Sequence, residues 1–232
     1  MTTTPRAMIL AAGRGERLRP LTDHQPKALT RVAGDTLVER HLRRLARAGV
    51  HEIVVNLGWL GAQLRQALGD GGRYGVSIAW SDEGWPALET GGGVQRALPL
   101  LGAAPFLLVN ADIWTDYPLA DLLARARELA PRDLVHLVTV ANPAHHPRGD
   151  FAVRDGRVTA GGERWTFAGL SVQRPELFAH SRPGAFPIAP LWREAIHAGR
   201  AAGERYAGRW FDVGTPERLA EAAAWAAAHP DE

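Results

Sequence analysis

The alternation of short apolar runs with amphipathic stretches over the first 140 residues constrains the fold most strongly. Apolar runs predict strands at 7–10, 52–56, 77–80, 106–110 and 134–140. Between them, apolar residues at helical spacing predict helices at 36–49, 60–68, 92–98 and 119–129. This β-α-β-α rhythm predicts an α/β fold: a Rossmann-like, mostly parallel sheet with helices on both faces. Ligands in such sheets bind beyond the carboxyl ends of the strands.

The alternation stops near residue 141. A hairpin is expected over 151–158, turning at Asp155 and Gly156, and a strand over 165–172. A helix over 190–198 and a short strand over 210–213 follow. Thr215 and Pro216 begin an Ala-rich helix over 215–229, as N-cap and first helical residue. We therefore expect one domain over 1–232, with a small lobe at 141–212 added to the main part at 7–140.

The composition excludes several classes of protein. The chain has no cysteine, so disulfides, thiol catalysis and thiolate metal sites are excluded. No apolar run of about 18 residues is present and the N-terminus does not resemble a signal peptide, which predicts a cytoplasmic protein that does not enter membranes. The net charge is only +2 and the basic residues are dispersed, so we expect no nucleic-acid partner.

One of the 27 basic residues, Lys27, is the single lysine of the chain. All the others are arginines. A lone lysine indicates a position where a compact ammonium is needed and a planar guanidinium is not suitable. The alternative is that Lys27 remains by compositional chance.

A glycine-containing loop follows the first expected strand. Gly13 and Gly15 let backbone N–H groups approach phosphate oxygens, and Arg14, Arg17 and Lys27 can add positive charge. The loop does not match the dinucleotide fingerprint, because a leucine stands where the third glycine belongs, and it does not match the Walker A motif. Two glycines alone are also typical of an ordinary turn.

Two aspartates follow expected strands that are far apart in the sequence. Asp112 ends the string Asn-Ala-Asp at the fourth strand, and Asp212 precedes Val-Gly-Thr near the C-terminus. A single aspartate in such a place is often a turn former. Two carboxylates that converge on one cleft would suit Mg²⁺, which takes one or two carboxylates together with phosphate oxygens and water.

The string Leu-Ala-Ala-Gly-Arg-Gly-Glu-Arg-Leu-Arg-Pro-Leu-Thr at 10–22, followed by Pro26 and Lys27, resembles the signature of the sugar nucleotidylyltransferases. The resemblance implies that the loop wraps a nucleoside triphosphate, that Lys27 meets its phosphates, and that Asp112 and Asp212 hold Mg²⁺. Ala28 departs from the family, which has a second proline there. The implied catalytic residues are Lys27, Arg17 and Asp112. The implied nucleotide-binding residues are Leu10, Ala11, Ala12, Gly13, Arg14, Gly15, Lys27, Glu83, Glu89, Thr90 and Gly91.

The same resemblance assigns the acceptor sugar phosphate to the segments 142–151 and 166–170. The implied substrate-binding residues are Asn110, Asn142, Gly149, Asp150, Thr166 and Gly169. A zinc site at His145 and His146 is rejected because adjacent side chains diverge and no third ligand has suitable spacing. An ordinary surface loop is the alternative. Many relatives hold the sugar phosphate with a lysine in this lobe, where this chain offers only Arg164.

The glycine run at 91–93 and the acceptor segments look most like the branch of the family that acts on N-acetylmuramate 1-phosphate. The resemblance therefore implies transfer of UMP from UTP to that sugar phosphate, with pyrophosphate released, as part of peptidoglycan recycling. Mannose 1-phosphate with GTP and glucose 1-phosphate with dTTP remain alternatives. A catalytically inactive nucleotide sensor is disfavoured by the intact Lys27, Asp112 and Asp212, and a nicotinamide-dependent dehydrogenase by the missing third glycine.

Overall fold

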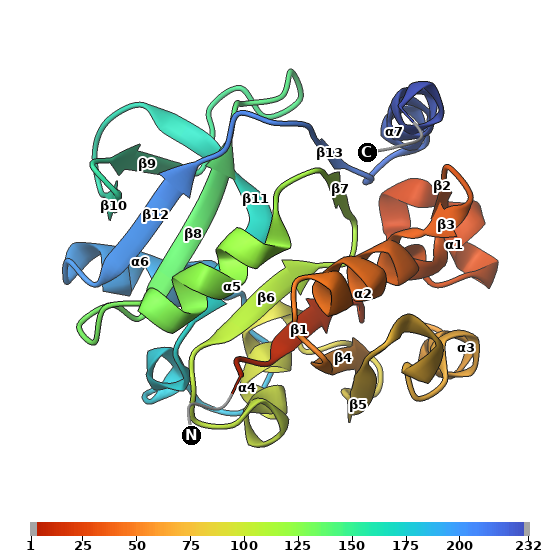
Figure 1. Cartoon of the computed structure of the whole chain (residues 1–232), viewed down its shortest axis with the longest axis horizontal. Helices are drawn as coiled ribbons and strands as arrows, with labels where there is room; N and C mark the ends of the chain where they lie inside the picture. The colour runs from red at the N-terminus through yellow and green to blue at the C-terminus, as the bar shows by residue number, and fades with distance from the viewer. Residues whose placement is uncertain (1–3, 230–232) are drawn as a thin grey trace.

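The computed structural model describes residues 4–229 (Figure 1). A nine-stranded sheet with the order β5-β4-β1-β6-β11-β8-β12-β10-β9 runs through the molecule. Its strands are β1 (Ala7–Leu10), β4 (Glu52–Leu57), β5 (Ser77–Asp82), β6 (Phe106–Asn110), β8 (Val135–Val140), β9 (Phe151–Arg154), β10 (Arg157–Thr159), β11 (Arg164–Gln173) and β12 (Ala201–Arg205). Strands β5, β4, β1 and β6 are parallel neighbours, and β12 is parallel to β8, whereas β11 lies antiparallel between β6 and β8. The expected mostly parallel sheet is confirmed.

Helices cover both faces of this sheet. Alternate residues of each strand serve different sides: Ile9 of β1 belongs to a core with α2, α3 and α5, whereas Met8 belongs to a core with α4 and α6. In Figure 1, α2 and α5 lie in front of the strands. The helices are α1 (Leu21–His24), α2 (Leu37–Arg47), α3 (Gly61–Leu68), α4 (Glu89–Leu101), α5 (Leu119–Glu128), α6 (Ala189–His197) and α7 (Pro216–Ala228), with short 3-10 turns at η1 (Glu16–Leu18), η2 (Lys27–Leu29), η3 (Gly72–Tyr74) and η4 (Pro175–Phe178).

Local signals place the main helices correctly. Thr36 caps α2 and forms the expected capping box, in which its Oγ1 accepts from Glu39 N at 3.3 Å and Glu39 Oε2 accepts from Thr36 N at 3.1 Å. Thr215 caps α7, as its sequence predicts. No helix of residues 4–229 is both long and apolar enough to cross a membrane.

The sheet closes on itself in its mixed half. The hairpin of β9 and β10 turns at Asp155 and Gly156, which both have positive φ, as the sequence predicts. Strand β10 pairs with β12, and β9 pairs with the first residues of β11. The five strands β8, β12, β10, β9 and β11 therefore form a ring of pairings. The sequence did not predict β12, whose residues are mostly small or charged.

A second, two-stranded ribbon carries the C-terminal segment to the end of β6. Strand β7 (Ile113–Thr115) pairs antiparallel with β13 (Trp210–Asp212), so that Asp212 stands opposite Ile113. Val213 N donates to Asp112 O at 2.7 Å. Helix α7 packs over this ribbon in a third core that includes Trp114. A further small ribbon joins β2 (Arg31–Val32) to β3 (Asp35–Thr36).

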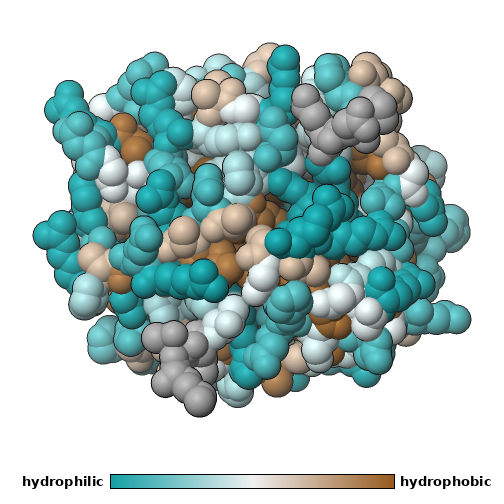
Figure 2. Space-filling model, in the orientation of Figure 1, coloured by the Kyte–Doolittle hydropathy of each residue, from teal (hydrophilic) through white to brown (hydrophobic). Residues whose placement is uncertain are grey.

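The surface is mainly polar. Figure 2 shows that hydrophilic side chains cover most of the visible face, with hydrophobic ones in the gaps between them. Among the described residues the large hydrophobic side chains that are exposed are Leu21, Trp85 and Leu100. They lie at separate places in the sequence, as scattered exposed hydrophobics do in ordinary monomers.

Candidate active site

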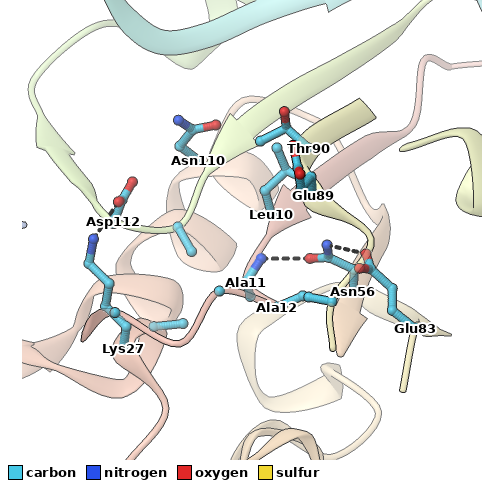
Figure 3. A pocket seen from close by; sticks show the side chains of 15 residues that line it. Leu10, Ala11, Ala12, Lys27, Asn56, Glu83, Glu89, Thr90, Asn110 and Asp112 are labelled. Atoms are coloured by element: carbon cyan, nitrogen blue, oxygen red, sulfur yellow. Dashed lines mark hydrogen bonds and ion pairs between the residues drawn. The ribbon is translucent and has the colours of Figure 1, made fainter. Parts of the chain in front are cut away.

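A cavity of about 240 Å³ lies where β1 and β6 end, beyond the carboxyl edge of the parallel strands (Figure 3). This is the place that the fold predicts for a ligand. The residues that line it are Leu10, Ala11, Ala12, Gly13, Gly15, Lys27, Ala28, Asn56, Glu83, Ala87, Glu89, Thr90, Asn110, Ala111 and Asp112. Nine of the residues that the sequence assigns to the nucleotide are therefore at this cavity: Leu10, Ala11, Ala12, Gly13, Gly15, Lys27, Glu83, Glu89 and Thr90.

The glycine loop approaches the cavity through its backbone. A Cβ on Gly13 would meet nothing within 4 Å, so its backbone borders open space. Gly15 has a φ of +69°, and a Cβ there would lie 3.0 Å from the Lys27 side chain. The carbonyl of Gly15 also accepts a hydrogen bond from the Thr22 hydroxyl at 2.8 Å. Glycine is needed at this turn because both the backbone angle and the approach of Lys27 exclude a side chain.

A chain of buried hydrogen bonds fixes the opposite wall of the cavity, and Figure 3 shows its central links. Ala11 N donates to Asn56 Oδ1 at 2.6 Å, and Asn56 Nδ2 donates to Glu83 Oε1 at 2.7 Å. Glu83 Oε2 accepts from Leu88 N at 2.8 Å. These bonds join the ends of β1, β4 and β5 to the start of α4. The sequence analysis missed Asn56, although a polar residue at the end of a buried strand was a visible signal.

The glycine run at the start of α4 is explained by close packing. A Cβ on Gly93 would collide with Glu83 and would lie 3.2 Å from Asn56 Nδ2. Gly91 N donates to Phe186 O at 2.9 Å, and Gly91 packs against the Phe186 ring without lining the cavity. The run therefore lets α4 approach both the buried carboxylate and the loop before α6.

Lys27 and Asp112 form an ion pair between the glycine loop and the end of β6, as Figure 3 shows. The distance from Lys27 Nζ to Asp112 Oδ2 is 2.5 Å. The lysine side chain is only 13% exposed, whereas that of Asp112 is 36% exposed. The ammonium is therefore held inside the cavity wall, with a carboxylate that remains accessible.

The segment that carries Asp112 is supported from α2. His41 is buried, and its Nε2–H donates to the carbonyl oxygen of Ile113 at 3.0 Å. Burial, assisted by the charge of Arg44, lowers the pKa of His41 to about 3. A neutral imidazole therefore anchors the residue that follows Asp112.

A second cavity, of about 310 Å³, adjoins the first and shares Asn110 and Asp112 with it. Its lining residues are Arg17, Asn110, Asp112, Ile113, His145, His146, Thr166, Phe167, Gly169, Trp210 and Asp212. They come from segments separated by up to about 200 residues in the sequence. Both aspartates proposed as metal ligands line this cavity together with Arg17.

The donor set around Asp212 is consistent with a divalent metal bound together with a phosphorylated substrate. Within residues 4–229 no group of three or more histidine, cysteine, aspartate or glutamate side chains could hold a metal. Asp212 is paired with Arg218, whose Nη1 lies 2.9 and 2.7 Å from the two carboxylate oxygens. Two carboxylates on one cavity fit Mg²⁺, which binds to one or two carboxylates plus substrate phosphates.

Three residues expected at the acceptor form the scaffold of the second cavity instead of its lining. Asp150 accepts from His146 Nε2 at 3.0 Å and from Phe167 N at 2.8 Å. Asn142 Nδ2 donates to the Arg164 carbonyl at 2.9 Å, and its Oδ1 accepts from Thr166 Oγ1 at 2.9 Å. A Cβ on Gly149 would meet that same carbonyl at 2.7 Å. These bonds fix the segment that carries His145 and His146.

Some predicted residues lie away from both cavities. Arg14 stacks over the Trp59 ring at 4.1 Å and pairs with Asp23 at 3.2 Å, which braces the outside of the glycine loop. Arg148 and Arg164 are exposed and line neither cavity. The histidines His145 and His146 do line the second cavity, so they are the better candidates for acceptor contacts.

Comparisons with known proteins agree with this geometry. A family model described as nucleotidyl transferase matches residues 6–154. The chain is 48% identical to N-acetylmuramate alpha-1-phosphate uridylyltransferase of Neisseria meningitidis serogroup B, over 96% of this chain and 99% of that protein. It is 37% identical to the protein of the same name from Caulobacter vibrioides, over 96% and 100% of the two chains. A crystal structure of a putative glucose-1-phosphate thymidylyltransferase from Bacillus anthracis has the same fold, with a TM-score of 0.85, 17% identity and coverage of 95% and 94% of the two chains.

Proposed function

Because the chain belongs to the nucleotidyl transferase family, we propose that it transfers UMP from UTP to N-acetylmuramic acid α-1-phosphate. The products are UDP-N-acetylmuramic acid and pyrophosphate. The observation that carries this proposal is the pair of adjoining cavities that meet at Asn110 and Asp112. The identity of 48% over 96% of the chain to a uridylyltransferase supports the choice of base and sugar.

In this proposal the two parts of the chain hold different substrates. Residues 7–140 bind UTP in the first cavity, with the base toward Glu83 and the phosphates toward the glycine loop and Lys27. Residues 141–212 supply most of the acceptor cavity, which Asn110 and Asp112 complete from the nucleotide side. The acceptor phosphate is thereby brought to the α-phosphorus across Asp112.

The reaction needs no dedicated general base. A phosphate monoester has a second pKa of about 6, so its oxygen is largely deprotonated at neutral pH and attacks the α-phosphorus directly. The bond from the α-phosphorus to the β-phosphate oxygen breaks, and pyrophosphate leaves. The chain's contribution is to bring two anions together and to stabilise the charge on the departing pyrophosphate.

Positive charge for these anions comes from Lys27 and Arg17. Lys27 is placed at the glycine loop, and Arg17 lines the acceptor cavity. Members of this family generally use a divalent metal. We propose that the metal is Mg²⁺, that Asp112 and Asp212 would hold it, and that it supplies charge neutralisation for the phosphates. We also propose that the protein works in the cytoplasm, in peptidoglycan recycling.

A pyrophosphate-release assay tests the proposal. Each of UTP, dTTP and GTP is combined with N-acetylmuramate, N-acetylglucosamine, glucose and mannose 1-phosphates in the presence of Mg²⁺. The highest kcat/KM is expected for UTP with N-acetylmuramate 1-phosphate. A clear preference for GTP with mannose 1-phosphate, or for dTTP with glucose 1-phosphate, would replace the substrate assignment and leave the enzyme class unchanged.

A further inference from the structure

Arg218 is a buried cation beside the acceptor cavity that the proposed reaction does not yet use. It lies in the first turn of α7, where the helix dipole favours anions and disfavours cations. Its side chain is 12% exposed. A buried arginine in such a position needs an anionic partner.

Of the three guanidinium nitrogens of Arg218, only Nη1 has hydrogen-bond partners in the described chain. Nη1 donates to Asp212 and also lies 2.7 Å from Nε2 of His145. Because a guanidinium has no acceptor, that imidazole nitrogen must accept, so one nitrogen serves both neighbours. Nε and Nη2 are buried and have no hydrogen-bond partner within residues 4–229. Unsatisfied buried N–H groups of a charged side chain are costly, which indicates that a further acceptor is missing.

A second arginine converges on the same point. The Nη2 atoms of Arg17 and Arg218 both approach the position that a Cβ on Gly214 would occupy. Arg17 lines the acceptor cavity and forms no ion pair or hydrogen bond with the rest of the described chain. Glycine at 214 therefore leaves space that two guanidinium groups share, with Asp212 as the nearby carboxylate. Two adjacent guanidinium groups with open donors are suited to one oxyanion.

We propose that Arg218, together with Arg17, binds an oxyanion of the acceptor sugar, either its phosphate or a carboxylate carried on the ring. The inference rests on the proposed function, because it takes the second cavity as the acceptor site. Asp212 is also the proposed metal ligand, so its oxygens are shared between the metal and Arg218 when both substrates are bound. The guanidinium is then free to turn toward the acceptor. Arg218 then binds the acceptor anion, a task for which the exposed Arg164 is poorly placed.

Binding measurements by titration calorimetry in the presence of Mg²⁺ test this, with UMP, UDP-N-acetylglucosamine and UDP-N-acetylmuramic acid as probes. UMP lacks the acceptor phosphate, and only the last probe carries the lactyl carboxylate. For Arg218→Gln we expect at least about a tenfold loss of affinity for UDP-N-acetylmuramic acid and no change for UMP. An equal loss for UDP-N-acetylglucosamine identifies the phosphate as the partner, and a loss confined to the muramic acid probe identifies the carboxylate.

Two control variants make the outcome decisive. Arg193→Gln removes an exposed arginine of α6 and should leave all three affinities unchanged. Arg218→Lys keeps the charge and serves if the glutamine variant melts much earlier than the wild type. Unchanged affinity for UDP-N-acetylmuramic acid in Arg218→Gln would overturn the proposal. So would an equal loss for UMP, because that result means that Arg218 only positions Asp212. The wild type's own preference between the two UDP-sugars tests the muramate assignment separately.

Discussion

The cavity that we propose for the nucleotide and the cavity that we propose for the acceptor are built in different ways. One short stretch, residues 10–28, supplies seven of the fifteen residues that line the first, and segments around 56, 83–90 and 110 supply the other eight. The second takes one to three residues from each of five distant segments, around 17, 110, 145, 166 and 212. Side-chain hydrogen bonds such as those of Asp150 and Asn142 hold these segments in place. In our proposal, the phosphate-binding part of the first cavity is therefore encoded largely by a local string, whereas the acceptor cavity depends on the assembled sheet.

Asp112 is the residue where the two cavities meet, so its loss should affect both. We expect Asp112→Asn to lower kcat by about 100-fold or more with the fold intact, because the amide keeps the shape but loses the charge. Steady-state kinetics at saturating Mg²⁺ and a thermal melt provide the measurement. A variant that keeps more than about a tenth of the wild-type rate would remove Asp112 from the metal site.

A substitution of Lys27 probes the proposed nucleotide cavity without the second cavity, because Lys27 lines only the first. We expect Lys27→Arg to lower kcat/KM for UTP by about tenfold or more, because Nζ contacts Asp112 inside a closely packed loop and a planar guanidinium does not fit the same point. The KM for the acceptor should change little. Wild-type kinetics in this variant would show that the single lysine remains by chance. Arg19→Lys, at an exposed arginine of the same loop, is the reverse control.

His145 and Arg148 test the acceptor side. His145 lines the acceptor cavity, so His145→Ala should lower kcat/KM for N-acetylmuramate 1-phosphate by about fivefold to tenfold. If His145 contacts the lactyl group, the substitution should also reduce the selectivity for N-acetylmuramate 1-phosphate over N-acetylglucosamine 1-phosphate. Arg148 lies in the same segment, but its exposed position leads us to expect no change in Arg148→Ala. A loss of selectivity in Arg148→Ala with none in His145→Ala would assign the lactyl contact to Arg148 instead.

A substitution of Glu204 probes the stability of the mixed half of the sheet, because Glu204 lies in β12 and lines neither cavity of the site. Burial alone would raise the pKa of Glu204, but the nearby imidazole of His136, a hydrogen bond from Tyr117 and the charge of Arg125 outweigh it and lower the pKa to about 2. The unfolded chain therefore takes up the proton first as the pH falls. Glu204 stabilises the fold above about pH 4.5, and this contribution is lost between about pH 4.5 and 2.

We expect Glu204→Gln to lower the free energy of unfolding by about 1 kcal/mol at pH 6, and by much less near pH 2. Urea denaturation at both pH values measures the difference, and kcat at neutral pH should not change. Glu128→Gln, at an exposed glutamate of the neighbouring helix, is the control. An equal effect of the two substitutions would mean that the buried cluster adds nothing.

The sequence by itself determined the parallel half of the fold and the glycine loop at the first cavity. Apolar periodicity, the Thr36 and Thr215 caps and the string at 10–27 act within a few residues, so their outcome depends little on the rest of the chain. Tertiary structure decided the rest. Strand β12 forms because β8 offers it a partner, in spite of residues such as Ala202 and Gly203 with low strand propensity. Asn56, Arg17 and Arg218 acquire their neighbours only when strand ends and the C-terminal helix come together. Contacts over such separations depend on sheet order, which no local pattern records.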